Sequence, residues 1–290
     1  MPPTKTRTWT HRLVRWLVGA VCCYLGVMVL LLFLENRLLY HPVRGDEEWH
    51  PPPNALVQDI ELEAAGAKLH AWWCPPPEWD TARGAMLYCH GNAGNLSNRA
   101  DAIADWQQER GEAILIFDYP GYGRSDGKPS EAGCYAAGEA AYDWLVENQH
   151  VAPGRLILLG RSLGGGVATH LAVQSPHRAL VLISPFTSVP DMAQKQFPWL
   201  PGRWLVRNRF DNLARIEDCH EPLFIAHGTD DGLVPFTQAE TLFAAANEPK
   251  YLFPMTGVGH NAPLGREFYL RLRDFLSHRV ALASDQTDSR

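Results

Sequence analysis

The sequence lacks the charge pattern and the short motifs that identify several common protein classes. Lysine and arginine number 26 against 32 aspartate and glutamate residues, so the formal net charge is -6 and no basic field favours nucleic acid. No phosphate-binding loop, zinc finger or EF-hand motif occurs. What remains is a composition typical of a globular protein, 46% hydrophobic and 20% charged.

Paired cysteines are also missing. Cys22 and Cys23 lie together in an apolar run, and the other four of the six cysteines are scattered between residues 74 and 219. This spacing predicts neither a disulfide framework nor a cysteine-bound metal. The length of 290 residues allows one large α/β domain with an appendage.

An uncharged apolar run near the N-terminus predicts a transmembrane helix. It extends over residues 16–34. At 1.5 Å per residue, such a helix nearly crosses a hydrocarbon core of about 30 Å. A cleaved signal peptide is the alternative, but its apolar region is shorter and a small-residue cleavage site should follow. This run ends in LFLENRLLY, so we expect an uncleaved signal anchor.

Charges on either side of the run predict its orientation. No acidic residue precedes it, whereas the basic residues there are Lys5, Arg7, Arg12 and Arg15. The segment after it mixes both signs, so the positive-inside rule predicts a cytoplasmic N-terminus, residues 1–15. The rest of the chain would then face the periplasm, a lumen or the exterior. Residues 35–54, rich in proline and charge, are expected to form an extended linker.

The alternation of short apolar runs and helical patterns over residues 55–280 predicts a mostly parallel sheet covered on both faces. Two alternating segments around Gly66 predict an antiparallel hairpin at one edge. Residues 281–290 are expected to be a disordered tail. The other predicted strands are 85–90, 113–119, 156–160, 179–184, 223–227 and 251–255, and the helices are 97–109, 133–148, 164–175, 237–247 and 266–280.

Two segments match G-x-S-x-G, the pattern of a serine nucleophile, and both carry an arginine before the serine. Such a nucleophile stands where a strand turns sharply into a helix, with small residues on both sides. Ser162 meets this requirement, because a predicted strand precedes it and three glycines follow. Ser125 lies in a loop with two prolines and three glycines, so we interpret it as a loop residue that shapes the pocket wall. A dinucleotide fingerprint at the same glycines fails on spacing.

A serine nucleophile needs a base and a group that orients the base. In this type of fold the chain order is serine, acid, histidine. His260, in the loop after the last predicted strand, is the candidate base. His227 is interpreted as structural, and His90 precedes the serine. Asp230 and Asp231 are adjacent candidates for the acid, and local physics does not choose between them.

Two backbone N–H groups are expected to form an oxyanion hole for the tetrahedral intermediate. One belongs to Leu163, the residue after the candidate nucleophile. The other belongs to Asn92, in a loop where Gly91 and Gly94 allow close backbone approach.

Five segments together carry a resemblance to a known family: HGNAGN, FDYPGYGRSDGKPSE, GRSLGGGVATHLA, HGTDDGLVP and GVGHN. They resemble membrane-anchored α/β-hydrolases of the α/β-hydrolase domain-containing protein 13 group, also described as serine aminopeptidase-like or prolyl-oligopeptidase-like. The similarity covers most of residues 40–279. It implies the α/β-hydrolase fold with Ser162 as nucleophile and His260 as base, and the pattern HG-x-x-D-x-x-V-P favours Asp231 over Asp230.

The resemblance also implies hydrolase chemistry through an acyl-enzyme, without a metal or cofactor, and acyl esters, thioesters and peptides all fit this mechanism. We expect the substrate to be a carboxylic ester or thioester. Residues 186–212 lie where this fold inserts a cap, and this aromatic segment is expected to bind a small or lipid-like acyl group. The pocket residues predicted there are Phe186, Phe197, Trp199 and Trp204. Contact with the bilayer and plain packing of these aromatic side chains are the alternatives. A peptidase on the same triad and a non-catalytic, membrane-tethered protein are the alternative functions.

Overall fold

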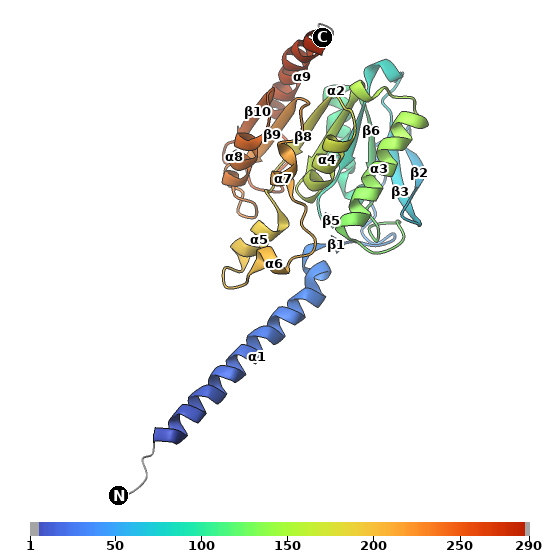
Figure 1. Cartoon of the computed structure of the whole chain (residues 1–290). Coiled ribbons are helices and arrows are strands. Elements are labelled where there is room, and N and C mark those ends of the chain that lie inside the picture. Colours follow the sequence, from blue (N-terminus) through green and yellow to red (C-terminus); the bar gives the residue numbers. More distant parts are fainter. Residues whose placement is uncertain (1–5, 288–290) are drawn as a thin grey trace, which may run out of the picture.

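Eight strands form one mixed sheet (Figure 1). The computed structural model describes residues 6–287. The strands of the sheet are β2 (Gln58–Ala64), β3 (Ala67–Cys74), β4 (Ala85–Cys89), β6 (Ala113–Phe117), β7 (Leu156–Arg161), β8 (Ala179–Ile183), β9 (Leu223–Gly228) and β10 (Lys250–Met255). They lie in the order β10-β9-β8-β7-β4-β6-β3-β2. The pairs of β3 with β2 and β6 are antiparallel and the others are parallel, which confirms the predicted sheet with an antiparallel edge.

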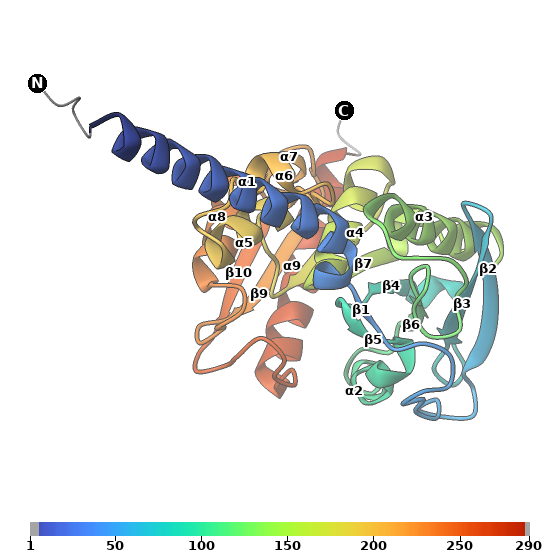
Figure 2. The same ribbon diagram turned by 90° about the horizontal axis from the view of Figure 1, so that it is seen from below.

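Helices cover both faces of the sheet (Figures 1 and 2). One face carries α3 (Glu131–Glu147), α4 (Leu163–Gln174), α7 (Asn212–Ile216) and α8 (Phe236–Ala245). The other carries α2 (Ala100–Arg110) and α9 (Arg266–Thr287). Each face has its own hydrophobic cluster, which explains why the central strands are apolar throughout instead of alternating. In the described part of the chain, the 3₁₀ helices η1 (Thr81–Arg83), η2 (Leu96–Arg99) and η3 (Pro153–Arg155) lie in connections.

The C-terminal helix is longer than the sequence predicts. Because α9 continues to Thr287, the disordered tail expected from residue 281 is wrong as far as residue 287, and residues 288–290 lie outside the described part of the chain. Lys5 of the predicted cytoplasmic segment also lies outside it.

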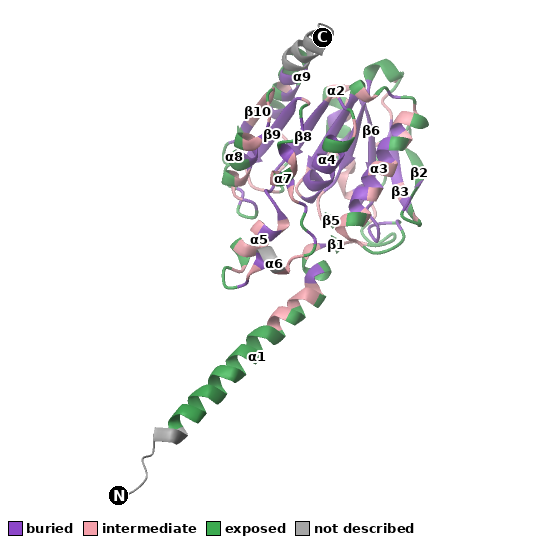
Figure 3. Cartoon of the chain, viewed as in Figure 1, coloured by how far each residue is buried: buried purple, intermediate pink, exposed green. Residues whose placement is uncertain are grey.

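The N-terminal helix α1 (Thr6–Leu39) extends away from the sheet (Figure 1). Its segment Trp9–Leu39 is long and apolar enough to cross a membrane, a test that a signal sequence near the N-terminus also passes. Most of the helix is exposed, and only its last turns are partly buried against the domain (Figure 3).

The segment that follows α1 is docked on the domain, so the extended linker expected for residues 35–54 is wrong. Its first residues are still helical, and β1 (His41–Pro42) then pairs in parallel with β5 (Ala93–Gly94). The Tyr40 side chain is only 3% exposed and packs edge-on against Phe210. Proline and charge favour an extended spacer only where the backbone finds no partner, and here β5 supplies one.

Between β8 and α7 the chain leaves the sheet and forms a small cap. The cap contains α5 (Val189–Gln196) and α6 (Gly202–Leu205). It lies at the carboxyl end of the parallel strands, close to the last turns of α1 (Figures 1 and 2). This is the insertion expected over residues 186–212.

Candidate functional site

Ser162 stands at the turn between β7 and α4, as the sequence predicts. Its backbone has φ 52° and ψ -117°, a conformation that is strained for a non-glycine residue and is often found at functional sites. The neighbouring glycines are required by close packing. A Cβ atom on Gly160 would lie 2.5 Å from the carbonyl oxygen of Gly164, and one on Gly164 would overlap the carbonyl group of Cys89. The turn therefore exposes the serine hydroxyl at the end of the strand.

Three side chains from three loops form a chain of hydrogen bonds at this turn. The Ser162 Oγ atom lies 3.0 Å from Nε2 of His260. The Nδ1 atom of the same imidazole lies 2.7 Å from Oδ2 of Asp231. When Nδ1–H donates to the carboxylate, Nε2 is left as an acceptor for the serine proton. The arrangement has the atoms needed to activate a hydroxyl as a nucleophile.

The two adjacent acids occupy different environments. Asp231 is only 6% exposed, and its Oδ1 atom accepts hydrogen bonds from the backbone N–H groups of Leu233 (2.9 Å) and Val234 (2.8 Å). Asp230 is exposed, and its carboxylate accepts from the Thr229 hydroxyl. The tertiary structure thus brings Asp231 to the histidine and turns Asp230 towards solvent.

A second histidine, His227, also holds Asp231. This residue is fully buried, and its Nε2 atom lies 2.8 Å from the carbonyl oxygen of Val234 and 3.2 Å from Oδ2 of Asp231. Burial by itself would raise the pKa of the Asp231 carboxyl, but hydrogen bonds from His227, His260 and Val234 outweigh it and hold this pKa well below its ordinary value. Asp231 is therefore ionised at neutral pH. The link from His227 to the acid was missed by the sequence analysis, because only tertiary contact reveals it.

Arg161 is a further residue whose contact the sequence analysis missed. Its guanidinium donates to the backbone carbonyl oxygens of His260 (3.1 Å) and Ala262 (3.0 Å). The residue just before the serine therefore fixes the loop that carries the imidazole. The sequence shows an arginine before both serines, but it does not show that one of them reaches a loop about 100 positions away.

The two predicted oxyanion residues line the same cavity. Leu163 begins α4, where backbone N–H groups have no partner within the helix. The chain at Asn92 is held firmly, because its carbonyl oxygen accepts from the His41 N–H (3.1 Å) and the Tyr122 hydroxyl (2.8 Å) and its side-chain amide donates to the Leu39 carbonyl (2.7 Å).

Ser125 has a structural environment. Its hydroxyl accepts a hydrogen bond from the His70 N–H (2.9 Å) and donates to the Asp118 carbonyl (3.0 Å). It is a loop residue, as predicted, but it is not among the described residues that line the cavity, so its expected role in the pocket wall is wrong. His90 is fully buried, with Nδ1 2.7 Å from the carbonyl oxygen of Gly91.

A cavity of about 350 Å³ opens over Ser162, within the usual size range of small-molecule sites. Phe186 and Phe197 line it, as predicted. Trp199 does not line it: this side chain is 56% exposed and contacts the rings of Tyr24 and Phe197. The side chain of Trp204 lies outside the described part of the structure. Apart from the loops that contain Asn92, Ser162 and residues 232–234, the described lining comes mainly from the cap and from α1.

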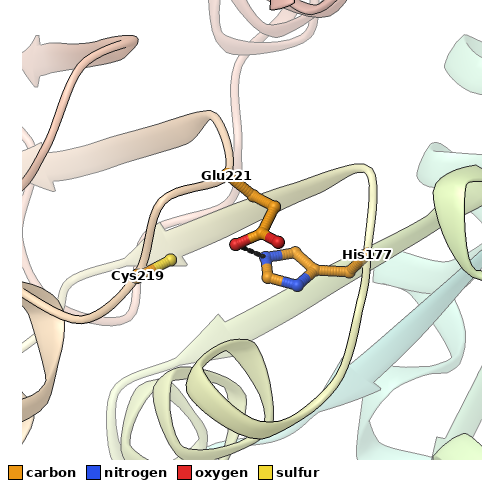
Figure 4. Close-up of side chains that lie close together, drawn as sticks. All are labelled: His177, Cys219 and Glu221. Atoms are coloured by element: carbon orange, nitrogen blue, oxygen red, sulfur yellow. Dashed lines mark ion pairs between the residues drawn. The ribbon is translucent and has the colours of Figure 1, made fainter. Parts of the chain in front are cut away.

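One cluster of potential metal ligands lies elsewhere, formed by His177, Cys219 and Glu221 (Figure 4). These residues precede β8 and β9, so they lie at the amino ends of the strands, opposite Ser162. Burial lowers the pKa of His177 and raises that of the Cys219 thiol to about 12, so both groups are neutral at pH 7. The distance of 4.0 Å between Nε2 of His177 and Oε2 of Glu221 is too long for a hydrogen bond. Because the cluster lies at the opposite end of the strands, it is not part of the site around Ser162.

Comparison with known proteins agrees with this fold. Residues 84–218 match the family of the alpha/beta hydrolase fold. The uncharacterized protein Rv2307c of Mycobacterium tuberculosis is 39% identical over 266 residues, which cover 89% of this chain and 92% of the relative. The α/β-hydrolase domain-containing protein WAV2 of Arabidopsis thaliana is 32% identical over 79% of this chain and 81% of its own length.

Solved structures extend the comparison to the fold. The Pyrococcus furiosus esterase Pf2001 superposes with a TM-score of 0.66 at 20% identity, over 83% of this chain and 97% of the esterase. Est1E of Butyrivibrio proteoclasticus, solved with ferulic acid bound, gives a TM-score of 0.64 at 20% identity, over 77% and 99% of the two chains.

Proposed function

We propose that this chain, which belongs to the α/β-hydrolase family, is a membrane-anchored serine hydrolase that cleaves carboxylic esters or thioesters. The observation that carries the proposal is the hydrogen-bonded series from Asp231 through His260 to Ser162, with the serine at a strained turn between strand and helix. The constellation is recognised by this geometry, and its chain order of serine, acid and histidine is that of the family.

The reaction proceeds in two halves. Ser162 Oγ attacks the carbonyl carbon while His260 Nε2 takes its proton, and Asp231 holds the imidazole in the correct tautomer. The N–H groups of Asn92 and Leu163 stabilise the oxyanion. The bond between the acyl carbon and the leaving oxygen or sulfur then breaks, and His260 returns the proton to the leaving group. Water, deprotonated by the same imidazole, then attacks the acyl-enzyme. The bond between the acyl carbon and Ser162 Oγ breaks, the imidazolium returns its proton to Oγ, and the acid is released.

The nature of the cavity supports an ester or thioester over a peptide. A peptidase that selects a free amine needs an accessible acidic group near the serine. Glu35 is the acidic residue among the described cavity residues, and its carboxylate is bonded to Arg207 and Asn208. The structural neighbours that are described as esterases favour the same substrate class.

The anchor is part of the proposal. The segment Trp9–Leu39 has the length and composition for a membrane span, and the domain docks on the end of this helix without a free linker. The cytoplasmic position of the N-terminus, with the domain on the other side, stays a prediction from the charges.

A covalent serine probe tests the proposed function. The full chain in detergent would be treated with a fluorophosphonate, followed by p-nitrophenyl esters of rising chain length. We expect labelling and ester hydrolysis in the wild type, and neither in Ser162→Ala. Labelling that survives Ser162→Ala would assign the nucleophile elsewhere, and a wild type that never labels would contradict the enzymatic proposal.

A further inference from the structure

We propose that the membrane helix α1 is itself a wall of the substrate site, and that the substrate is a long-chain lipid ester that reaches Ser162 laterally from the bilayer. This inference rests on the proposed serine hydrolase function and names its substrate class. The cavity over Ser162 contains residues of α1 from Met28 to Leu39 among its lining. A helix that served only as a tether would have no reason to contribute to the substrate cavity.

One face of α1 is turned towards the cavity. The lining residues of the helix recur at helical spacing: Met28, Leu31, Leu32, Glu35, Leu38 and Leu39. Leu30 and Phe33 lie between these positions, do not line the cavity, and are 55% and 81% exposed. The burial pattern in Figure 3 shows the same change along the helix, which is exposed over most of its length and partly buried near the cap. The last turns of α1 therefore have a protein face and a lipid face.

A network around Glu35 fixes this face to the cap. The Glu35 carboxylate accepts hydrogen bonds from the backbone N–H groups of Arg207 (2.9 Å) and Asn208 (2.7 Å), and from both of their side chains. The Asn208 side chain also bonds to Asn36, and its Oδ1 atom accepts from the Tyr40 hydroxyl at 2.8 Å. This many charge-assisted hydrogen bonds hold the helix in a defined register. The wall formed by α1 is a fixed part of the site.

A second contact between α1 and the cap lies nearer the N-terminus of the helix. The Tyr24 hydroxyl donates to the carbonyl oxygen of Trp199 (3.0 Å), and the two rings pack with their centroids 6.4 Å apart. The cap therefore follows α1 into the apolar run. The exposed Trp199 side chain matches the preference of tryptophan and tyrosine for the boundary between water and hydrocarbon.

These contacts place the cavity at the level of the bilayer. The apolar run ends at Leu34, and Met28 lies six residues before it, which is about 9 Å along a helix axis. Part of the cavity wall thus lies in the layer where acyl chains begin. A lipid whose ester group is near the headgroups can present its carbonyl to Ser162 while its chain stays between α1 and the cap.

The chemistry of the cavity selects such a chain. Its described lining is mainly apolar, and the ionisable side chains in it are Glu35, which is already bonded to Arg207 and Asn208, and Lys195. Each methylene buried there adds favourable transfer free energy, so the cavity favours long chains over short ones. A water-soluble ester would use little of this surface.

The test uses the full chain reconstituted in vesicles of ether-linked phosphatidylcholine, which contain no hydrolysable ester. Mono-oleoylglycerol in the same bilayer is the long-chain substrate, and p-nitrophenyl acetate in the buffer is the short one. Leu31→Trp narrows the cavity, and Leu30→Trp is the matched control on the lipid face. We expect Leu31→Trp to lower the ratio of long-chain to short-chain kcat/KM by about tenfold or more, since a pocket discriminates by roughly 10–200-fold per methylene. The control should keep the wild-type ratio within about twofold.

A second experiment tests whether the substrate enters from the bilayer, by supplying the lipid either in the enzyme's own vesicles or in separate ones. With access from the bilayer, mono-oleoylglycerol in the enzyme's own vesicles is hydrolysed much faster than the same amount in separate vesicles. Equal rates from both would overturn lateral access.

Folding and the proposed function are monitored separately. Fluorophosphonate labelling of Ser162 reports whether each variant keeps its site, and Leu31→Ala provides a second cavity variant, which should raise the relative rate for bulkier branched chains. If the wild type labels and cleaves both esters while the ratios of the Leu31 variants equal that of Leu30→Trp, the role of α1 is wrong and the hydrolase proposal stands. If the wild type neither labels nor cleaves, the hydrolase proposal itself fails.

Discussion

The chain contains nearly the same five residues twice, as GRSDG at 123–127 and as GRSLG at 160–164, in two very different environments. In the first, the hydroxyl of Ser125 is used by the backbone of its own loop and of β3. In the second, the serine stands at positive φ between β7 and α4 with its hydroxyl on His260. The arginines differ as well. Arg161 bonds to the loop of the imidazole, whereas Arg124 is over the ring of Trp49 and pairs with Asp46.

This contrast shows what turns a motif into a site. The five-residue motif contains a serine, and therefore a small hydroxyl group, in both cases. A strand that ends and a helix that begins at the serine decide whether that hydroxyl is used by the backbone or is free for chemistry. The comparison also provides matched variants, since the arginine and the serine of one segment have counterparts in the other.

The largest expected effect comes from the two serines themselves. Ser162→Ala should lower kcat for ester hydrolysis by a factor on the order of 10⁶ because it removes the nucleophile, while Ser125→Ala should keep most of the activity. Initial rates with p-nitrophenyl butyrate would measure both. If Ser125→Ala folded and lost more activity than Ser162→Ala, the assignment of the two serines would be wrong.

The next largest effect should be the difference in kcat between substitutions of the two adjacent aspartates. Asp231→Asn should lower kcat by about 10⁴, because the neutral amide favours the wrong tautomer of His260. Asp230→Asn replaces the exposed aspartate with a side chain of the same shape, and it should change kcat by less than about twofold. Measured rates for the two variants, each checked by circular dichroism, decide between them. Comparable losses in both would mean that the carboxylates share the role.

The arginines of the two segments should also differ in their effect on activity. Arg161→Met should lower kcat/KM by about 10- to 100-fold, since a small displacement of the imidazole is costly. The decline should appear mainly in kcat, and Arg161→Lys should recover part of it. Arg124→Met is the control, with an expected change below about twofold. Equal effects of the two methionine variants would show that Arg161 contributes only stability.

Ser125 should matter for stability. In Ser125→Ala the N–H of His70 loses its partner, and an unsatisfied buried donor costs about 1–3 kcal/mol. Urea unfolding of the full chain in detergent would measure the loss against the wild type. Ser125→Cys, which retains a weak hydrogen-bonding group, should be intermediate, and an unchanged midpoint in both variants would count against the network.

The smallest expected effect is on acid stability. The folded pKa of Asp231 is depressed, so its ionised contacts stabilise the protein fully above its unfolded pKa of about 3.9 and are lost as the pH falls through the folded value. The difference in unfolding free energy between wild type and Asp231→Asn should therefore be constant near neutral pH and decrease below about pH 4. Thermal melts from pH 7 to pH 3 would measure it, and a difference that grows on acidification would contradict the assignment.

Much of the fold was determined by local sequence patterns. Apolar runs of strand length, helical spacing and the glycines around Ser162 were enough to predict the parallel sheet, its antiparallel hairpin and the turn that carries the serine. These features depend on residues close together in the chain, where steric and burial constraints act locally. The apolar helix was predicted for the same reason.

Contacts between distant residues were decided only by the tertiary structure. Asp230 and Asp231 differ by one position, and only the packing of their loop turns Asp231 to His260. His227 and Arg161 gain their partners in the same way. The expected linker became part of the domain because β5 offers it backbone partners. Likewise, no local pattern in α1 shows that one of its faces lines the cavity over Ser162, since hydrophobic spacing reports that a face is apolar but not whether protein, substrate or lipid covers it.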